Sequence, residues 1–123
     1  MVSVTSRSVA VLGSTGSIGT QALEVIAAHP GAFTVAALTA GGNVELLARQ
    51  AVEFDVPLVG VARGQVEDVR AAIAAAAADA GRPASVTDVV VGADAATIAA
   101  GCGADVVLNG ITGSIGLRPT LAA

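Results

Sequence analysis

Three glycines spaced three residues apart follow an apolar, β-branched run near the start of the chain. Residues 8–12 read Ser-Val-Ala-Val-Leu, which predicts a buried strand, and a helical pattern begins at Ser17. Between them, Gly13, Gly16 and Gly19 give the spacing G-x-x-G-x-x-G. A strand, a glycine-rich loop and a helix in this order are typical of a βαβ unit that binds phosphate at the helix N-terminus. The chain is therefore restricted to α/β folds.

Each glycine of this loop has a distinct expected role. Gly13 allows a tight exit from the strand, Gly16 lets the backbone approach a phosphate, and Gly19 lets the helix lie close to the strand. A turn that merely needs glycines is the alternative, but three glycines at period three exceed that need. Hydroxyl donors are expected from Ser14, Thr15 and Ser17.

Strand-like runs alternate with helical patterns along the rest of the chain. Strands are expected at 8–12, 33–38, 57–62, 86–91 and 105–109, with Thr87 and Asp88 indicating an edge strand or an irregular start. Helices are expected at 17–28, at about 43–54, from 66 to a break at 81–83, and where Ala95, Ile98, Ala99 and Cys102 share one face. The prediction is an open, doubly wound, Rossmann-type parallel sheet in a single domain, 1–123.

The C-terminal part carries a second glycine-rich segment, 110–116, that repeats much of 13–19. Two nucleotide sites are one interpretation. We favour a single cleft that this segment lines from the other side of the point where the strand order reverses. The pattern predicts a helix that begins at 117 without a stop signal, so we expect a sheet truncated at its C-terminal end, with association or marginal stability as the result.

Composition excludes several classes of function. The chain has no Lys, Tyr or Trp, which removes Lys nucleophiles, Schiff bases and the P-loop lysine. One Cys and one His cannot build the usual zinc site, and a net charge of −4 with six scattered arginines lacks a basic patch for nucleic acid. We expect no membrane span and no secretion, hence a cytoplasmic protein.

The remaining polar side chains predict structural roles. His29 stands in the last turn of the first helix, where an imidazole favours the negative dipole end. Cys102 is expected to fill the core. The acids Asp88, Asp94 and Asp105 show no metal-ligand spacing and are expected as caps or solvated groups, with Asp94 an N-cap.

The end of the second strand bears on the choice between NAD and NADP. Residues 38–43 read Leu-Thr-Ala-Gly-Gly-Asn, with no carboxylate to hold a ribose 2′-hydroxyl. Gly41 and Gly42 would let the backbone reach a 2′-phosphate, and Asn43 could donate to it. Asn43 is equally expected as a helix N-cap, and the two roles are compatible. Arg49 is a distant counter-charge.

Residues 9–26, 29–43 and 104–123 closely resemble the N-terminal region of 1-deoxy-D-xylulose 5-phosphate reductoisomerases. That family isomerises its sugar-phosphate substrate and reduces it with NADPH to 2-C-methyl-D-erythritol 4-phosphate for isoprenoid biosynthesis, and it needs a divalent metal (Mg, Mn or Co). The resemblance implies that Thr15, Gly16, Ser17 and Ile18 hold the NADPH pyrophosphate. It also implies that Gly41, Gly42 and Asn43 hold the 2′-phosphate, although many members have Lys at the position of Gly42.

The resemblance further implies that the family's metal ligands, substrate phosphate site and catalytic flap follow Ala123. The chain is then the NADPH-binding domain of an oxidoreductase, inactive alone, with a homo-oligomer possible. An extended short-chain dehydrogenase shares the glycine spacing but needs a Tyr and a Lys that this chain lacks. A stand-alone NADPH-binding regulatory or sensor module is the other alternative.

Overall fold

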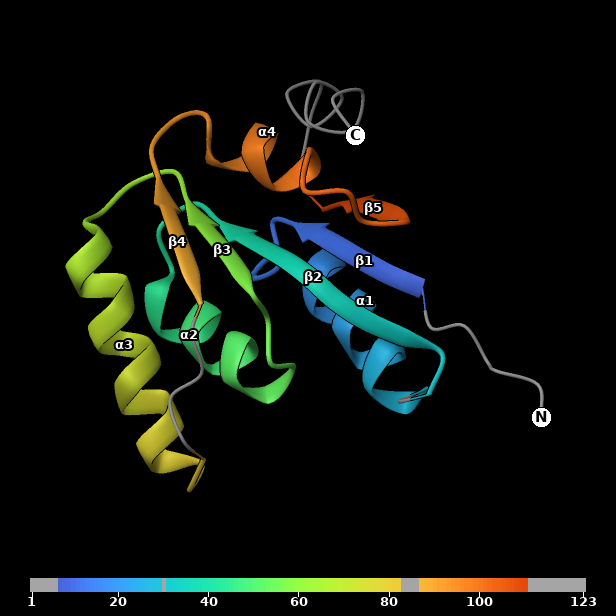
Figure 1. Cartoon of the computed structure of the whole chain (residues 1–123), viewed down its shortest axis with the longest axis horizontal. Coiled ribbons are helices and arrows are strands. Elements are labelled where there is room, and N and C mark those ends of the chain that lie inside the picture. Colours follow the sequence, from blue (N-terminus) through green and yellow to red (C-terminus); the bar gives the residue numbers. More distant parts are fainter. Residues whose placement is uncertain (1–6, 30, 83–86, 111–123) are drawn as a thin grey trace.

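The computed structural model describes residues 7–29, 31–82 and 87–110, in which strands and helices alternate (Figure 1). The strands are β1 (Arg7–Leu12), β2 (Phe33–Ala40), β3 (Leu58–Val61), β4 (Asp88–Val91) and β5 (Val106–Asn109). The helices are α1 (Ser17–Ala28), α2 (Val44–Glu53), α3 (Val66–Asp79) and α4 (Ala95–Ala100). The alternation predicted from the hydrophobic pattern is confirmed over this part of the chain.

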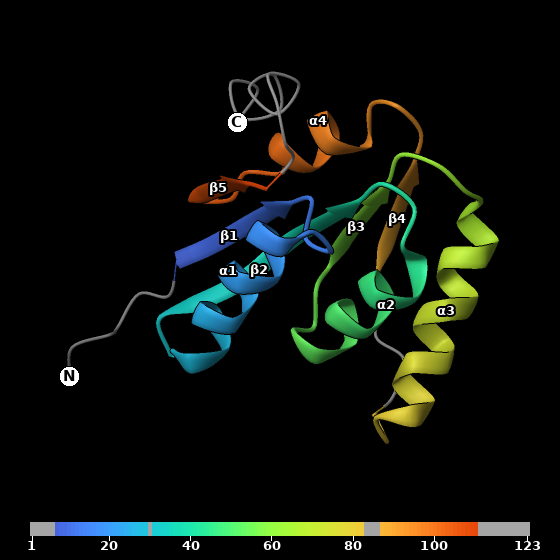
Figure 2. The same cartoon turned by 180° about the vertical axis from the view of Figure 1, so that it is seen from behind.

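The five strands form one parallel sheet in the order β4-β3-β2-β1-β5. Helices α1, α2 and α3 cover one face of the sheet, and α4 crosses the other face (Figures 1 and 2). The chain therefore steps outward from β1 to β4 and then returns over the opposite face to place β5 beside β1. The predicted doubly wound fold is confirmed, and the strand order reverses between β1 and β5.

Alternating side chains of β1 serve the two faces of the sheet. Val9 and Val11 belong to the large core beneath α1, α2 and α3, whereas Ala10 and Leu12 belong to a smaller core beneath α4. All four are buried, which is why this strand reads as a continuous apolar run. Small side chains let α4 come close to the sheet: a Cβ on Gly60 of β3 would lie 3.1 Å from the Cβ of Ala95.

Two helix ends have the caps that the sequence predicts. His29 is the C-cap of α1, and its Nδ1 lies 2.9 Å from the carbonyl oxygen of Val25. Asn43 is the N-cap of α2, and its Oδ1 accepts a hydrogen bond from the Leu46 amide at 3.3 Å. β4 begins at Asp88 and is an edge strand, as the polar start of this run indicates.

The prediction for α4 is wrong at its C-terminal end. The helix ends at Ala100, Cys102 is exposed, and Ile98 is 49% exposed. Glycines on both sides of Cys102 explain the early end, since Gly103 has φ +89°. Cys102 is therefore not core filler. Asp94 occupies the N-cap position but makes no side-chain capping bond.

Asp105 ties the start of β5 to β1. Its Oδ2 accepts from the Ser8 amide at 3.0 Å, and its own amide donates to Ser8 Oγ at 3.0 Å. The predictions for 111–116 and for a helix from 117 fall outside the described residues. Among the residues described, no helix is long and apolar enough to cross a membrane.

Candidate dinucleotide-binding site

The loop after β1 is held against the end of β2. Gly13 has φ +72°, the left-handed region expected for a tight strand exit. Its amide donates to Thr39 Oγ1 at 3.0 Å, and the Ser14 amide donates to the Thr39 carbonyl at 2.7 Å. These two bonds fix the loop relative to β2. The loop therefore lies at the edge of the sheet where the carboxyl ends of β1 and β2 meet.

Gly19 is the point of closest contact between α1 and the loop. A Cβ built at this position would overlap the carbonyl oxygen of Gly13 and lie 2.6 Å from Ser14 Cα. These neighbours are backbone atoms and cannot rotate away. The geometry supports the predicted role of Gly19 in close packing of the helix, with the loop directly after β1 as its neighbour rather than the strand.

The N-terminus of α1 presents amide groups without partners. Its N-cap is Gly16, which has no side chain to cap with, and the first helical bond runs from Thr20 to Gly16 at 2.9 Å. Within 7–29, 31–82 and 87–110, the amides of Ser17, Ile18 and Gly19 have no acceptor. Unpaired amides at the positive end of a helix dipole are suited to an anion.

Ser14 does not face this anion position. It is buried, its Oγ donates to Gln50 Oε1 at 2.7 Å, and its carbonyl accepts from Gln50 Nε2 at 2.9 Å. Its hydroxyl joins the loop to α2 instead, so the expectation of a phosphate donor at Ser14 is wrong. The pattern of loop residues alone could not show this, because Gln50 lies on a different helix.

A pocket of about 440 Å³ lies beside the loop, at the point where the strand order reverses between β1 and β5. It is lined by the loop after β1, the ends of β2 and β3, the start of α4 and the residue after β5. The lining residues are Gly13, Thr15, Gly16, Thr39, Ala40, Gly41, Ala62, Ala93, Ala95, Ala96 and Gly110. Ligands of open α/β sheets bind at this kind of position.

The structure brings four of the predicted site residues together at this pocket: Gly13, Thr15, Gly16 and Gly41. Ser17 and Ile18 stand beside it on the exposed end of α1, and Gly42 and Asn43 follow Gly41 into α2. Sequence reasoning missed the lining by Thr39 and Ala40 of β2, by Ala62 directly after β3, and by alanines at the start of α4. The available signal was that Thr39, Ala40 and Ala62 lie at or just after the ends of expected strands; no such signal marked the alanines of α4.

The turn between β2 and α2 carries no acidic side chain at 38–43. The nearest acid along the chain, Glu45, is in the first turn of α2. Arg63 lies over this turn: a Cβ on Gly42 would be 3.3 Å from its Nη2. The sequence singled out Arg49 instead, which the structure places along a hollow between α2 and α3.

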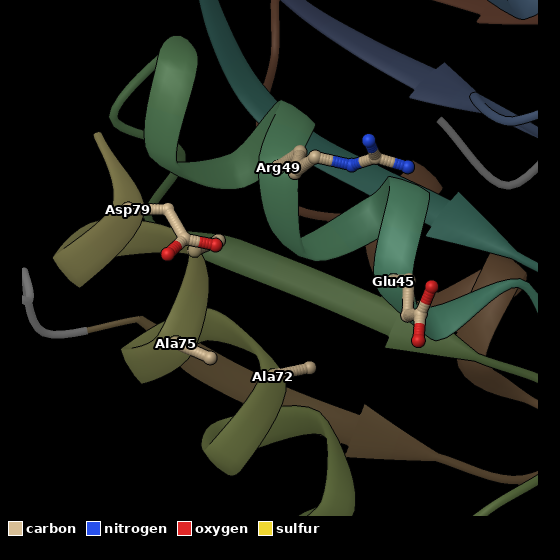
Figure 3. A pocket seen from close by; sticks show the side chains of 6 residues that line it. Glu45, Arg49, Ala72, Ala75 and Asp79 are labelled. Carbon is tan, nitrogen blue, oxygen red and sulfur yellow. The ribbon is translucent and has the colours of Figure 1, made fainter.

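That second hollow has a volume of about 380 Å³ and is lined by Glu45, Arg49, Ala72, Ala75, Ala76 and Asp79 (Figure 3). It lies between two helices on the outer side of the large core, and no strand end contributes to it. Small alanines and solvated charges account for it. The pocket beside the glycine loop, where several strand ends meet, is the candidate functional site.

The described residues at this site offer groups for binding a ligand. Among the residues that the structure describes, the lining consists of Gly, Ala and Thr, without a carboxylate, imidazole or thiol. In the described part of the chain, no group of three or more His, Cys, Asp or Glu side chains could hold a metal ion. The site offers backbone amides, one exposed helix end and a nearby guanidinium, which together fit a phosphate-containing ligand.

Comparisons with known proteins agree with this geometry. The sequence model of 1-deoxy-D-xylulose 5-phosphate reductoisomerase matches residues 9–123. The reductoisomerase of Beutenbergia cavernae is 62% identical over 121 residues, which cover 98% of this chain and 29% of that protein. The Zymomonas mobilis reductoisomerase in complex with NADPH superposes with a TM-score of 0.78 and 36% identity, over 97% of this chain and 29% of that one.

A crystal structure of DOX-P reductoisomerase with NADPH, fosmidomycin and magnesium superposes with a TM-score of 0.74 and 32% identity. It is matched over 94% of this chain and 27% of its own length. The chain thus spans less than a third of the length of the relatives that it matches.

Proposed function

The chain belongs to the 1-deoxy-D-xylulose 5-phosphate reductoisomerase family, and we propose that residues 1–123 form an NADPH-binding domain. We further propose that the protein takes part in the family reaction, the isomerisation and NADPH-dependent reduction of 1-deoxy-D-xylulose 5-phosphate to 2-C-methyl-D-erythritol 4-phosphate. The relatives carry the name of this enzyme, and two of the solved relatives hold NADPH.

One observation carries the proposal: the unpartnered amides at the start of α1 stand beside a pocket at the point where the strand order reverses. A dinucleotide needs this combination, since its pyrophosphate sits at the helix N-terminus and its sugars lie across the strand ends. A Cβ on Gly16 would be 3.6 Å from its nearest neighbour, so the glycine keeps open a space that the protein itself does not fill.

Each predicted contact can be assigned to a part of the cofactor. We assign the pyrophosphate to the segment 15–18, with Gly13 shaping the approach. We assign the adenosine ribose and its 2′-phosphate to Gly41, Gly42 and Asn43. Bound NADPH supplies a hydride, and the residues of this chain bind and orient it. Since the side chains described here offer no metal site, we assign no residue of this chain to the magnesium of the solved relative.

The alternative of a stand-alone NADPH sensor gains no support from the comparisons, because the matching relatives are named reductoisomerases. A cytoplasmic location and self-association stay predictions from the sequence.

Calorimetric titration of the purified 123-residue chain with NADPH, and separately with NADH, tests the proposal. Calorimetry suits this chain because it has no Trp or Tyr whose emission could report binding. We expect saturable binding at one site per chain, tighter for NADPH. Far-UV circular dichroism on the same sample establishes that the chain is folded. No binding of either dinucleotide by a folded chain would contradict the proposal.

A further inference from the structure

An arginine, Arg63, stands over the turn that follows β2. Ideal Cβ positions on Gly41 and Gly42 would lie 3.6 Å and 3.3 Å from Arg63 Nη2. The guanidinium therefore occupies the space above two residues that have no side chains of their own. Gly41 lines the candidate pocket, so this cation is next to the pocket rather than on a remote surface.

Backbone hydrogen bonds fix the position of Arg63. Ala40 pairs with Val61 in the β2–β3 register, and the Ala62 amide donates to the Ala40 carbonyl at 3.0 Å. The Arg63 amide then donates to the Gly41 carbonyl at 3.1 Å, which ties the two turns together beyond the last paired residues. Gly64, with φ +127°, turns the chain away toward α3. The base of the arginine is thus held, and its exposed side chain retains freedom.

No group in the described part of the chain forms an ion pair or a hydrogen bond with the guanidinium of Arg63. Its only hydrogen bond among those residues is made by its backbone amide, and it forms no ion pair there. The nearest acids along the chain are Glu67 and Asp68, which lie in the first turn of α3, where they favour the positive end of that helix dipole. An exposed, unpaired guanidinium beside a pocket remains available to a ligand anion.

The side-chain amide of Asn43 can donate to the same anion. Asn43 Oδ1 is occupied by the Leu46 amide, which leaves its Nδ2 as the outward donor of that side chain. No carboxylate is present at 38–43 to bind a ribose 2′-hydroxyl or to repel a phosphate. In dinucleotide-binding folds the turn after the second strand distinguishes NAD from NADP, and a nearby arginine accommodates the 2′-phosphate of NADP.

We propose that Arg63 is the specificity-determining residue of this site: its guanidinium binds the 2′-phosphate of NADPH and gives NADPH its advantage over NADH. This inference rests on the proposed function. A guanidinium presents paired donors to phosphate oxygens, and charge-assisted bonds of this kind are among the strongest that a side chain makes.

The test compares NADPH and NADH affinities of the 123-residue chain and three variants by calorimetry at one salt concentration. Arg63→Gln keeps length and polarity but removes the charge. We expect NADPH binding to weaken about tenfold or more, as loss of a charge-assisted hydrogen bond would cause, while NADH binding stays within about twofold. Arg63→Lys should retain part of the preference, since it keeps a point charge without the paired donors.

Arg49→Gln is the matched control, because it removes the same charge from the hollow between α2 and α3, and neither affinity should change. Circular dichroism and urea unfolding verify that each variant is folded. Equal NADPH-to-NADH ratios in Arg63→Gln and the unsubstituted chain would overturn the inference, as would equal weakening of both dinucleotides. A folded, unsubstituted chain that binds neither dinucleotide would instead contradict the proposed function itself.

Discussion

Replacement of Gly19 by alanine tests the close contact between α1 and the glycine loop. In an ordinary helix this change stabilises, because alanine has a helix propensity about 1 kcal/mol better than glycine. Here the added methyl would overlap the Gly13 carbonyl oxygen and lie 2.6 Å from Ser14 Cα. The two effects oppose one another, so the sign of the change in stability decides between a local and a tertiary role for this glycine.

The cost of the steric overlap exceeds the gain in helix propensity. Carbon atoms settle at about 3.5–4.0 Å, so α1 must move from the loop by roughly 1 Å. Neither partner is a flexible side chain, and both the loop and α1 are already held, by Thr39 and by the core residues Leu23 and Ile26. Overpacking of this kind costs about 1–3 kcal/mol. We expect a cost near the upper end, about 3 kcal/mol, of which the better helix propensity offsets about 1 kcal/mol. The net loss of about 2 kcal/mol lowers the melting temperature by roughly 10 °C.

Urea and thermal unfolding followed by far-UV circular dichroism measure this loss. Two glycines of the same chain serve as controls: a Cβ on Gly16 or on Gly101 meets its nearest neighbour at 3.6 Å, and neither has a positive φ. Both alanine variants should stay within about 1 kcal/mol of the unsubstituted chain. Gly16→Ala should nevertheless weaken NADPH binding, because its methyl enters the proposed phosphate space. A Gly19→Ala chain as stable as the original would refute the packing argument.

Two further changes probe the support of the site. Gln50→Leu leaves the buried Ser14 hydroxyl and carbonyl without their partner, and should lower the free energy of unfolding by about 2–4 kcal/mol in a urea titration; a loss below about 0.5 kcal/mol would show that this pair is dispensable. Asn43→Asp keeps an N-cap acceptor for α2 but places a carboxylate at the proposed 2′-phosphate position. Calorimetry should show NADPH binding weakened about tenfold with NADH binding maintained, and an unchanged NADPH affinity would remove Asn43 from the site.

The fold could be predicted because its signals are local. A buried parallel strand needs a continuous apolar run, and the five expected runs coincide with the five strands of the sheet to within a few residues. A wrong detail of the fold arose where two rules compete. An apolar spacing continues to Cys102, but Gly101 and Gly103 end α4 at Ala100 and leave that cysteine exposed. Backbone entropy overrides side-chain periodicity there.

The site was predictable only in its local part. The left-handed φ of Gly13 and the missing Cβ of Gly19 follow from the loop itself. The inward direction of Ser14 and the position of Arg63 do not, because Gln50 and Gly41 reach them through helix packing and strand pairing. A sequence shows which side chains exist, whereas the register between β2 and β3 decides which of them meet.

The place of β5 beside β1 has a consequence for how the molecule assembles. Ser8 and Asp105 are 97 positions apart, so this pairing closes the longest loop in the sheet and is expected late in folding. Until it forms, Gly110 cannot donate to the Leu12 carbonyl, and the pocket lacks that wall. A ligand of the pocket therefore meets an incomplete site in a partly assembled chain. By mass action, a ligand that binds the completed pocket favours the fully paired sheet. The proposed cofactor would therefore stabilise the pairing of β5 with β1, the step expected late in folding.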